Sequence, residues 1–233
     1  MKLDILAFAS HPDDADIACG GIILKHNAYG KKTGIIDLTR GEMGTRGSPE
    51  LRMKEADKAS KILGIAAREN LGLEDCFFQN DKENQLAIAK MIRKYQPEVI
   101  LCNAVADRHP DHGKGAKLVS DASFIAGLAK TKTTLDGKEQ QPWRVKAVYH
   151  YIQDRYAKPD LVIDITDVME KKIEGVMAFA SQFYNPDSNE PDTPISSKEF
   201  FNFLYARAAE MGRQIGVKYA EGLTVEKIGR AHV

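Results

Sequence analysis

The sequence has few of the features typical of secreted, membrane or disulfide-rich proteins. Its 233 residues include one tryptophan and three cysteines, Cys19, Cys76 and Cys102, which are far apart and odd in number. Neither a disulfide framework nor a zinc ribbon fits that spacing, so we expect buried free thiols. The first apolar run, Leu3–Ala9, is too short to cross a bilayer and has no cleavage pattern after it. We therefore expect a cytoplasmic protein without membrane contact.

A net charge is also lacking. Lysine plus arginine and aspartate plus glutamate each number 33, so no bulk field attracts nucleic acid. Apolar residues make up 43% of the chain and charged residues 28%, which is an ordinary globular mixture. The length suits one large α/β domain over residues 1–233. Any recognition of a partner must therefore be local.

Apolar or β-branched runs alternate with segments of helical spacing. This alternation predicts a Rossmann-like α/β fold, a three-layer sandwich with a mostly parallel sheet between helices. The strands are expected at Leu3–Ala9, Thr33–Thr39, Glu98–Asn103, Ala147–Gln153 and Leu161–Ile165. The helices are expected at Pro49–Leu63, Asp81–Tyr95, Asp167–Gln182 and Ser197–Gly216. The Pro- and Asp-rich stretch 184–196 is expected to be a loop, either a lid over a site or a surface excursion.

The first motif, "FASHPDDADIACGG", carries His11, Asp13 and Asp14 directly after the first expected strand. In open parallel sheets ligands bind beyond the carboxyl ends of strands. One imidazole and one carboxylate there could bind a divalent metal, and the adjacent carboxylate could take a proton from water. The alternative is structural, because either aspartate could cap the helix that follows.

The second motif, "NAVADRHPDHGKG", supplies His109, Asp111 and His112 after another expected strand. Because both His-Pro-Asp segments follow strands of one parallel sheet, we expect them to meet. His11, Asp14 and one of the two histidines would complete a three-ligand catalytic metal site. Asp13 suits a general base. A charged His109 supported by Asp111 suits an oxyanion or a leaving amine, which indicates hydrolysis of an acyl bond.

Three segments together resemble the LmbE-like, PIG-L type N-acetylglucosamine deacetylases: "HPDDADIACGG", "TRGEMGTRGSPELRMKEA" and "RHPDHGKG". The resemblance is greatest to the branch that deacetylates N-acetylglucosaminyl malate in bacillithiol biosynthesis. It implies that His11, Asp14 and His112 bind zinc, that Asp13 is the base, and that His109 acts with Asp111. It also implies a homo-oligomer, usually a hexamer. Iron(II) in place of zinc remains open, because two nitrogens and one carboxylate suit both metals.

Several residues are candidates for contact with the substrate. A guanidinium can hold a carboxylate of a malate aglycone, so Arg52, and next to it Arg108, are expected to bind the substrate. The alternative for Arg52 is a helix-surface pair with Glu55. By resemblance, Tyr184 could reach an oxyanion, and "YAEGL", Tyr219–Leu223, could line the sugar pocket; packing and a helix exit are the alternatives.

The remaining predictions concern three histidines and two glycines. His26, His150 and His232 have no partner pattern and are expected to have core or surface roles. Gly20 and Gly21 would let a helix pack closely, or would hold phosphate in a nucleotide-binding module, which is the competing class of protein. No G-x-G-x-x-G follows the first strand, which disfavours that module. A broader glycan or thiol-conjugate amidase is the alternative among enzymes.

Overall fold

The computed structural model describes residues 1–226, so the prediction for His232 lies outside the described residues. Within these residues, seven strands form one sheet and two more form a short hairpin. The strands are β1 Ile5–Ala9, β2 Thr33–Thr39, β3 Ala67–Leu73, β4 Val99–Cys102, β5 Thr134–Leu135, β6 Lys138–Glu139, β7 Ala147–Tyr151, β8 Leu161–Asp164 and β9 Ala220–Val225. The helices are α1 Asp14–Ala28, α2 Pro49–Leu63, α3 Lys82–Tyr95, α4 Pro110–Ala126, α5 Met169–Met177 and α6 Lys198–Arg213.

The large sheet has the order β3-β2-β1-β4-β7-β9-β8. Strands β1, β2, β3, β4 and β7 run parallel, whereas β9 is antiparallel to both of its neighbours. The chain leaves β1 toward β2 on one side and later returns to β4 on the other. The carboxyl ends of β1 and β4 therefore flank the switch point of the sheet, where α/β folds place ligands.

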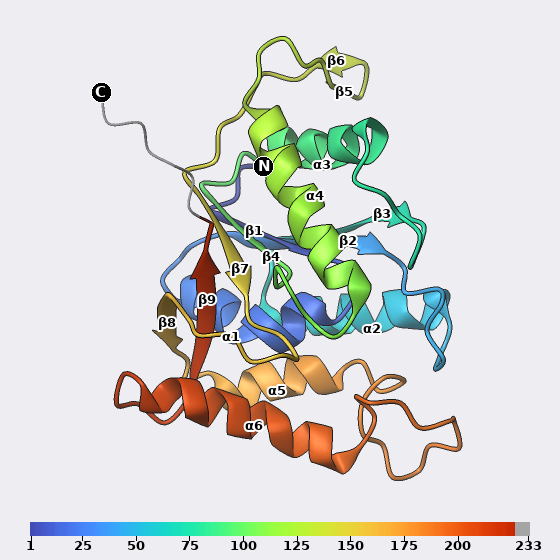
Figure 1. Cartoon of the computed structure of the whole chain (residues 1–233), viewed down its shortest axis with the longest axis vertical. Coiled ribbons are helices and arrows are strands. Elements are labelled where there is room, and N and C mark those ends of the chain that lie inside the picture. Colours follow the sequence, from blue (N-terminus) through green and yellow to red (C-terminus); the bar gives the residue numbers. More distant parts are fainter. Residues whose placement is uncertain (227–233) are drawn as a thin grey trace.

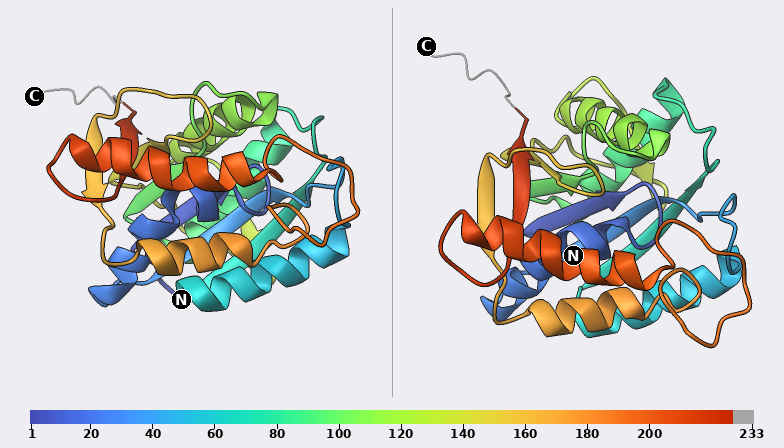
Figure 2. Two further views of the ribbon diagram at one scale, coloured as in Figure 1. Left: turned by 90° about the horizontal axis from the view of Figure 1, so that it is seen from below. Right: turned by 60° about the horizontal axis from the view of Figure 1, so that its bottom comes forward.

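Helices cover both faces of the sheet, which confirms the predicted three-layer Rossmann-like class (Figure 1). Helices α3 and α4 pack together on one face, and α1, α2 and α5 pack on the other, with α6 beside α5 (Figure 2). Central strand β1 is buried along its whole length, because apolar side chains cover it from both layers. No helix of residues 1–226 is long and apolar enough to span a bilayer.

Most expected elements are present, with differences at their ends. Helix α5 ends at Met177, not at Gln182, and the residues after it form turns. Tyr219–Leu223 is not a helix exit, because it enters strand β9. Its residues 220–222 line a small cavity that shares Ile17, Gln153 and Phe203 with the cavity over the histidines described below. Strand β3 was not expected at all. Its sequence, "ARENLGL", is polar and only partly buried, so it has no apolar run that would reveal a strand.

Gly21 is required by close packing in the middle of α1. A Cβ added there would meet the side chain of Ile165 at 2.7 Å. Gly21 thus serves helix packing, as one interpretation predicted, and has no space for phosphate. Helix α1 is kinked near this point, where Cys19 has φ −139°. All three cysteines are free; Cys19 and Cys102 are buried, as expected, and Cys76 is half-buried.

Candidate metal centre and active site

The two His-Pro-Asp loops meet, because β1 and β4 are adjacent and parallel. The backbone N–H of Ser10 donates to Oδ1 of Asn103 at 2.8 Å, and the Ser10 hydroxyl donates to the carbonyl of Asp111 at 2.9 Å. Gly115 permits this approach, since a Cβ there would lie 2.5 Å from the Ser10 hydroxyl oxygen. Direct hydrogen bonds therefore hold the two loops together, independently of any ligand.

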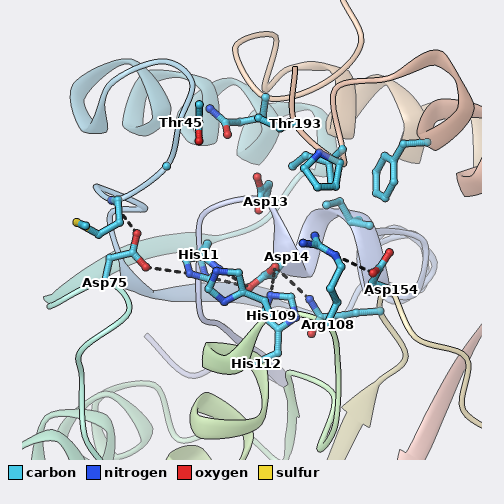
Figure 3. Close-up of a pocket in the computed structure, with 18 of the residues that line it drawn as sticks. His11, Asp13, Asp14, Thr45, Asp75, Arg108, His109, His112, Asp154 and Thr193 are labelled. Carbon is cyan, nitrogen blue, oxygen red and sulfur yellow. Dashed lines mark hydrogen bonds and ion pairs between the residues drawn. The ribbon is translucent and has the colours of Figure 1, made fainter. Parts of the chain in front are cut away.

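Three histidines gather where the loops meet (Figure 3). Ring nitrogens of His11, His109 and His112 lie within 4.8 Å of one another. The ring centroids of His11 and His109 are 4.6 Å apart, and those of His109 and His112 are 5.3 Å apart. Neutral imidazoles at this spacing are suited to ligate one metal ion.

Asp14 lies between two of these histidines. Its Oδ1 is 3.1 Å from Nε2 of His112, and its Oδ2 is 3.4 Å from Nδ1 of His11. Gln153 Nε2 and Asn103 Nδ2 each donate to this carboxylate at 3.0 Å. Burial alone would raise the pKa of Asp14, but His112 and His11 outweigh it and hold that pKa well below its usual range. The carboxylate is therefore ionised and its position is fixed.

The remote nitrogen of each of these histidines faces a second carboxylate. Nδ1 of His112 is 2.6 Å from Asp107, and Nε2 of His11 is 3.0 Å from Asp75. Metal-ligating histidines have such partners, which fix the tautomer and the ring orientation. This leaves Nε2 of His112 and Nδ1 of His11 directed at Asp14. Two nitrogens and one carboxylate oxygen fit a divalent zinc or iron ion.

These carboxylates also change the protonation of the histidines in the protein without metal. Burial by itself would lower the pKa of His112, but Asp14 and Asp107 outweigh it and raise that pKa to about 9. The pKa of His11 is likewise raised, against burial, by hydrogen bonds with Asp111, Asp14 and Asp75. Without a metal, protonated imidazoles take the place of the cation among the carboxylates. Metal binding must displace those protons.

Asp13 is held in an unusual backbone conformation beside this cluster. Its φ of 126° is in the left-handed half of the map, which non-glycine residues rarely occupy. Burial raises the pKa of its carboxyl to about 6, although Arg52 opposes this increase. Nη2 of Arg52 donates to Asp13 Oδ2 at 3.0 Å. Figure 3 shows Asp13 between the histidines and the two threonines on the far side of the cavity, Thr45 and Thr193.

His109 and Asp111 are arranged differently from the expectation. His109 caps α4, and its Nδ1 accepts a hydrogen bond from the backbone N–H of Asp111 at 3.2 Å. The carboxylate of Asp111 instead accepts from the Cys76 N–H at 2.8 Å and lies 3.7 Å from Nε2 of His11. Burial and the charges of His11 and His112 lower the pKa of His109, so without metal its ring is neutral near pH 7. The proton of this neutral ring lies on Nε2.

A cavity of about 220 Å³ opens over the cluster. Its polar wall includes Thr45, Gln153, Gln182 and Thr193. Its apolar wall is formed by Ile17, Met43, Pro194, Ile195, Phe200 and Phe203. The predicted metal ligands, Asp13, His109, Arg52 and Arg108 all line this cavity. It is therefore the place where a substrate can meet the metal site.

The predicted substrate-binding residues are not equally placed for that role. Arg52 pairs with Asp13, whereas Glu55 accepts hydrogen bonds from Ser181 instead. Arg108 is exposed and pairs with Asp154 at 2.8 Å. Tyr184 lines a separate cavity, beside Arg46 and Glu190, and is not part of the wall over the histidines. Its predicted contact with an oxyanion does not fit this position.

Sequence reasoning missed several residues of the site. Asp107 lies in the quoted second motif, two residues before His109, so its position could have been noticed. Asp75 follows β3, and because that strand was not predicted, Asp75 was not placed at this edge of the sheet. His26 and His150 have the structural roles that were expected: a ring nitrogen of His26 contacts the carbonyl of Ile22, and one of buried His150 contacts the carbonyl of Asn103.

Fold and site together define an α/β protein with a cluster of histidines and aspartates that could hold a metal ion, at the switch point of its sheet. The family model described as GlcNAc-PI de-N-acetylase, PIG-L, matches residues 6–123. The chain belongs to this family.

Known proteins are similar to the chain over most of its length. Diacetylchitobiose deacetylase of Thermococcus kodakarensis is 30% identical over 94% of this chain and 81% of its own. The conserved protein TT1542 of Thermus thermophilus has 35% identity and a TM-score of 0.84, covering 99% of this chain and 97% of its own. The 4-oxalmesaconate hydratase of Pseudomonas putida is 27% identical over 76% of this chain and 73% of its own. The relatives thus include both a deacetylase and a hydratase.

Proposed function

We propose that this protein is a metal-dependent hydrolase that removes the acetyl group from an N-acetylglucosamine conjugate. The observation that carries the proposal is that His11 and His112 lie against the two oxygens of Asp14, beside the buried carboxylate of Asp13. The family description and the name of the Thermococcus relative support deacetylation of an N-acetylated glucosamine.

His11, Asp14 and His112 would hold the divalent ion, zinc or iron(II). When bound, such an ion supplies a Lewis acid for the acetyl carbonyl and lowers the pKa of water. The protein's own contribution is a fixed set of donors, because each of the two histidines is oriented by a carboxylate, Asp107 or Asp75. Gln153 and Asn103 orient Asp14 in the same manner.

Asp13 is the proposed general base that accepts a proton from the attacking water. A base works best when its pKa lies near the working pH, and burial places the pKa of Asp13 at about 6. Arg52 keeps the carboxylate ionised and oriented. His109 lines the same cavity, where its Nε2–H can donate a hydrogen bond to the developing oxyanion. The proton that Asp13 takes from water would pass to the departing amine.

Two conjugates compete as the substrate, a malate glycoside and a neutral glycoside. A malate aglycone carries two carboxylates, and unpaired cations would be needed to hold them. Within residues 1–226, the two arginines that line the cavity are both paired, Arg52 with Asp13 and Arg108 with Asp154. Phe200 and Phe203 instead offer apolar surface. Of these two arginines, only Arg108 could meet a carboxylate, and only after its exposed pair with Asp154 opens; this favours a neutral aglycone, such as a second sugar, over malate.

The hydratase among the relatives raises a second candidate reaction, addition of water to a carboxylate-bearing alkene. The same base and metal ligands would serve it. The pairing of both cavity arginines disfavours such a substrate for the reason given for malate. The deacetylase proposal therefore fits the cavity better.

The decisive experiment measures release of acetate and free amine from diacetylchitobiose, N-acetylglucosaminyl malate and N-acetylglucosamine. Each is assayed after chelation and again after return of zinc or iron(II). We expect turnover that depends on the metal and is fastest with the neutral disaccharide. Absence of acetate release from all three substrates, with metal restored, would contradict the proposed reaction. Preference for the malate conjugate would contradict only the assignment of the aglycone.

A further inference from the structure

The loop 184–196 forms part of the cavity wall that faces the metal site. Thr193, Pro194 and Ile195 line the cavity, and Figure 3 shows Thr193 and Thr45 on the side opposite the histidines. Thr45 belongs to the segment after β2, which contributes Met43 and Gly44 to the same wall. Two segments far apart in sequence thus cover the site together.

One side chain joins these two segments. Nη2 of Arg46 donates to the hydroxyl of Ser188 at 2.5 Å, and Nε of Arg46 donates to Glu190 Oε2 at 3.4 Å. The N–H of Gly47 donates to Glu190 Oε1 at 3.0 Å. Within residues 1–226, these are the hydrogen bonds that connect the loop 184–196 to the rest of the chain. We refer to them together as the Arg46–Glu190 clamp.

The two sides of the clamp differ in how firmly they are held. The Arg46 side chain is 3% exposed, and its carbonyl accepts from Gln182 Nε2 at 2.9 Å. The Glu190 side chain is 43% exposed. The Nε–Glu190 contact is long, and opening of the loop would also uncover the Arg46 guanidinium to water, so the pair contributes little stability and the loop can open. If the loop opens, Arg46 would stay in place and Glu190 would move away with the loop.

A second cavity, of about 420 Å³, is lined largely by the loop itself, together with Arg46 and the start of α6. Asp192 and Ser196 line this cavity, whereas the three residues between them line the cavity over the metal site. The segment 192–196 is thus a partition between the two cavities. Movement of this segment away from the metal site would open the first cavity toward the second and lengthen the space available to a substrate.

We propose that the Arg46–Glu190 clamp is a specificity-determining device that limits the length of the conjugate the enzyme accepts. This inference rests on the proposed deacetylase function. With the clamp closed, a short conjugate fits between Thr193, Ile195 and the metal site. A longer conjugate requires the loop to leave Arg46, so it reacts only during opening.

The test compares Glu190→Ala with the matched control Asp187→Ala. Asp187 lies on the same loop, is exposed, and lines neither cavity. Hydrogen exchange of peptides that cover 184–196 reports the clamp without any substrate. We expect faster exchange in Glu190→Ala and unchanged exchange in Asp187→Ala. Equal exchange in the two variants and the wild type would overturn the clamp.

Kinetics of the metal-loaded enzymes then test the link to specificity. The substrates are a methyl glycoside of N-acetylglucosamine and a chito-oligosaccharide of four sugars. In Glu190→Ala we expect the ratio of kcat/KM, long over short, to rise by up to about fivefold, which is the effect of losing one partly exposed pair. An unchanged ratio would overturn the specificity role. A wild type inactive on both glycosides would contradict the proposed function instead, and the exchange experiment would still decide the clamp.

Discussion

Nη2 of Arg52 lies 3.0 Å from Oδ2 of Asp13, and both side chains are buried. This pair connects the start of α2 to the loop after β1. The cation opposes the rise in pKa that burial imposes on Asp13, so Arg52 controls the pH range in which the base is ionised. Arg52 is therefore a positioning residue for the proposed base, not a partner for the aglycone.

Replacement of Arg52 by methionine removes the cation that stabilises the ionised form of Asp13. The pKa of Asp13 then rises, and a base must be ionised to act. We expect the acidic limb of the kcat/KM profile to move to higher pH, whereas Arg52→Lys retains a charge and moves it less. Profiles of the metal-loaded variants on one glycoside substrate measure this shift. A limb that stays in place in Arg52→Met would show that Arg52 does not act through Asp13.

Asp13→Asn tests the base directly. Asparagine keeps the shape and one acceptor for Arg52 but cannot take a proton, so kcat should fall by roughly 10²–10⁴-fold. Asp13 is not one of the proposed ligands, so zinc stoichiometry should stay the same as in the wild type. Metal analysis and acetate release are measured on one preparation. His11→Ala is the matching control, because it should lose metal as well as activity.

The sequence allowed the centre of the site to be predicted because its two loops follow adjacent parallel strands. Each loop repeats a His-Pro-Asp segment, and the carboxyl ends of such strands meet at one edge of a sheet. The distances of 3.1–3.4 Å between the Asp14 oxygens and the nitrogens of His11 and His112 agree with that prediction. The repeated motif and the adjacency of the two parallel strands thus lead to the same prediction.

Contacts between residues far apart in the sequence could not be predicted from it. The partner of Arg52 lies 39 residues away, and no local pattern distinguishes Asp13 from Glu55 as that partner. Strand β3 is polar, so Asp75, which follows it, was not placed at the same edge. Glu221 lies in a segment without clear periodicity, yet it is buried in β9 and accepts hydrogen bonds from α1.

Asp107 orients His112 through the 2.6 Å contact with Nδ1, so Asp107→Asn tests the outer carboxylate. Asparagine can still accept the hydrogen bond from the Arg155 N–H but carries no charge. We expect zinc affinity to fall by about 10–100-fold, measured by competition with a chromophoric chelator. Asp154→Asn is the control, because that carboxylate pairs with Arg108 and, within residues 1–226, has no ion pair with a histidine. Equal zinc affinity in both variants would contradict the role of Asp107.

Lys172 and Glu221 form a buried ion pair that supports the kink of α1. Nζ of Lys172 is 2.7 Å from Glu221 Oε1, and both side chains are 5% exposed or less. The Glu221 carboxylate also accepts the N–H groups of Gly21, at 3.0 Å, and Ile22, at 2.7 Å, just after the irregular residue Cys19. Glu221 thus takes the place of an N-cap for the second part of α1.

Lys172→Met would leave the Glu221 carboxylate buried without its cation. Removal of one member of a buried ion pair leaves the other charge buried without compensation. The free energy of unfolding should therefore fall by about 3–5 kcal/mol. Denaturant unfolding measures this loss, with Lys171→Met, at an exposed position of the same helix, as the control. The double variant Lys172→Met with Glu221→Gln should recover part of the loss, since no charge is then left unpaired. A loss in Lys172→Met no larger than that in Lys171→Met would mean that the pair does not stabilise α1.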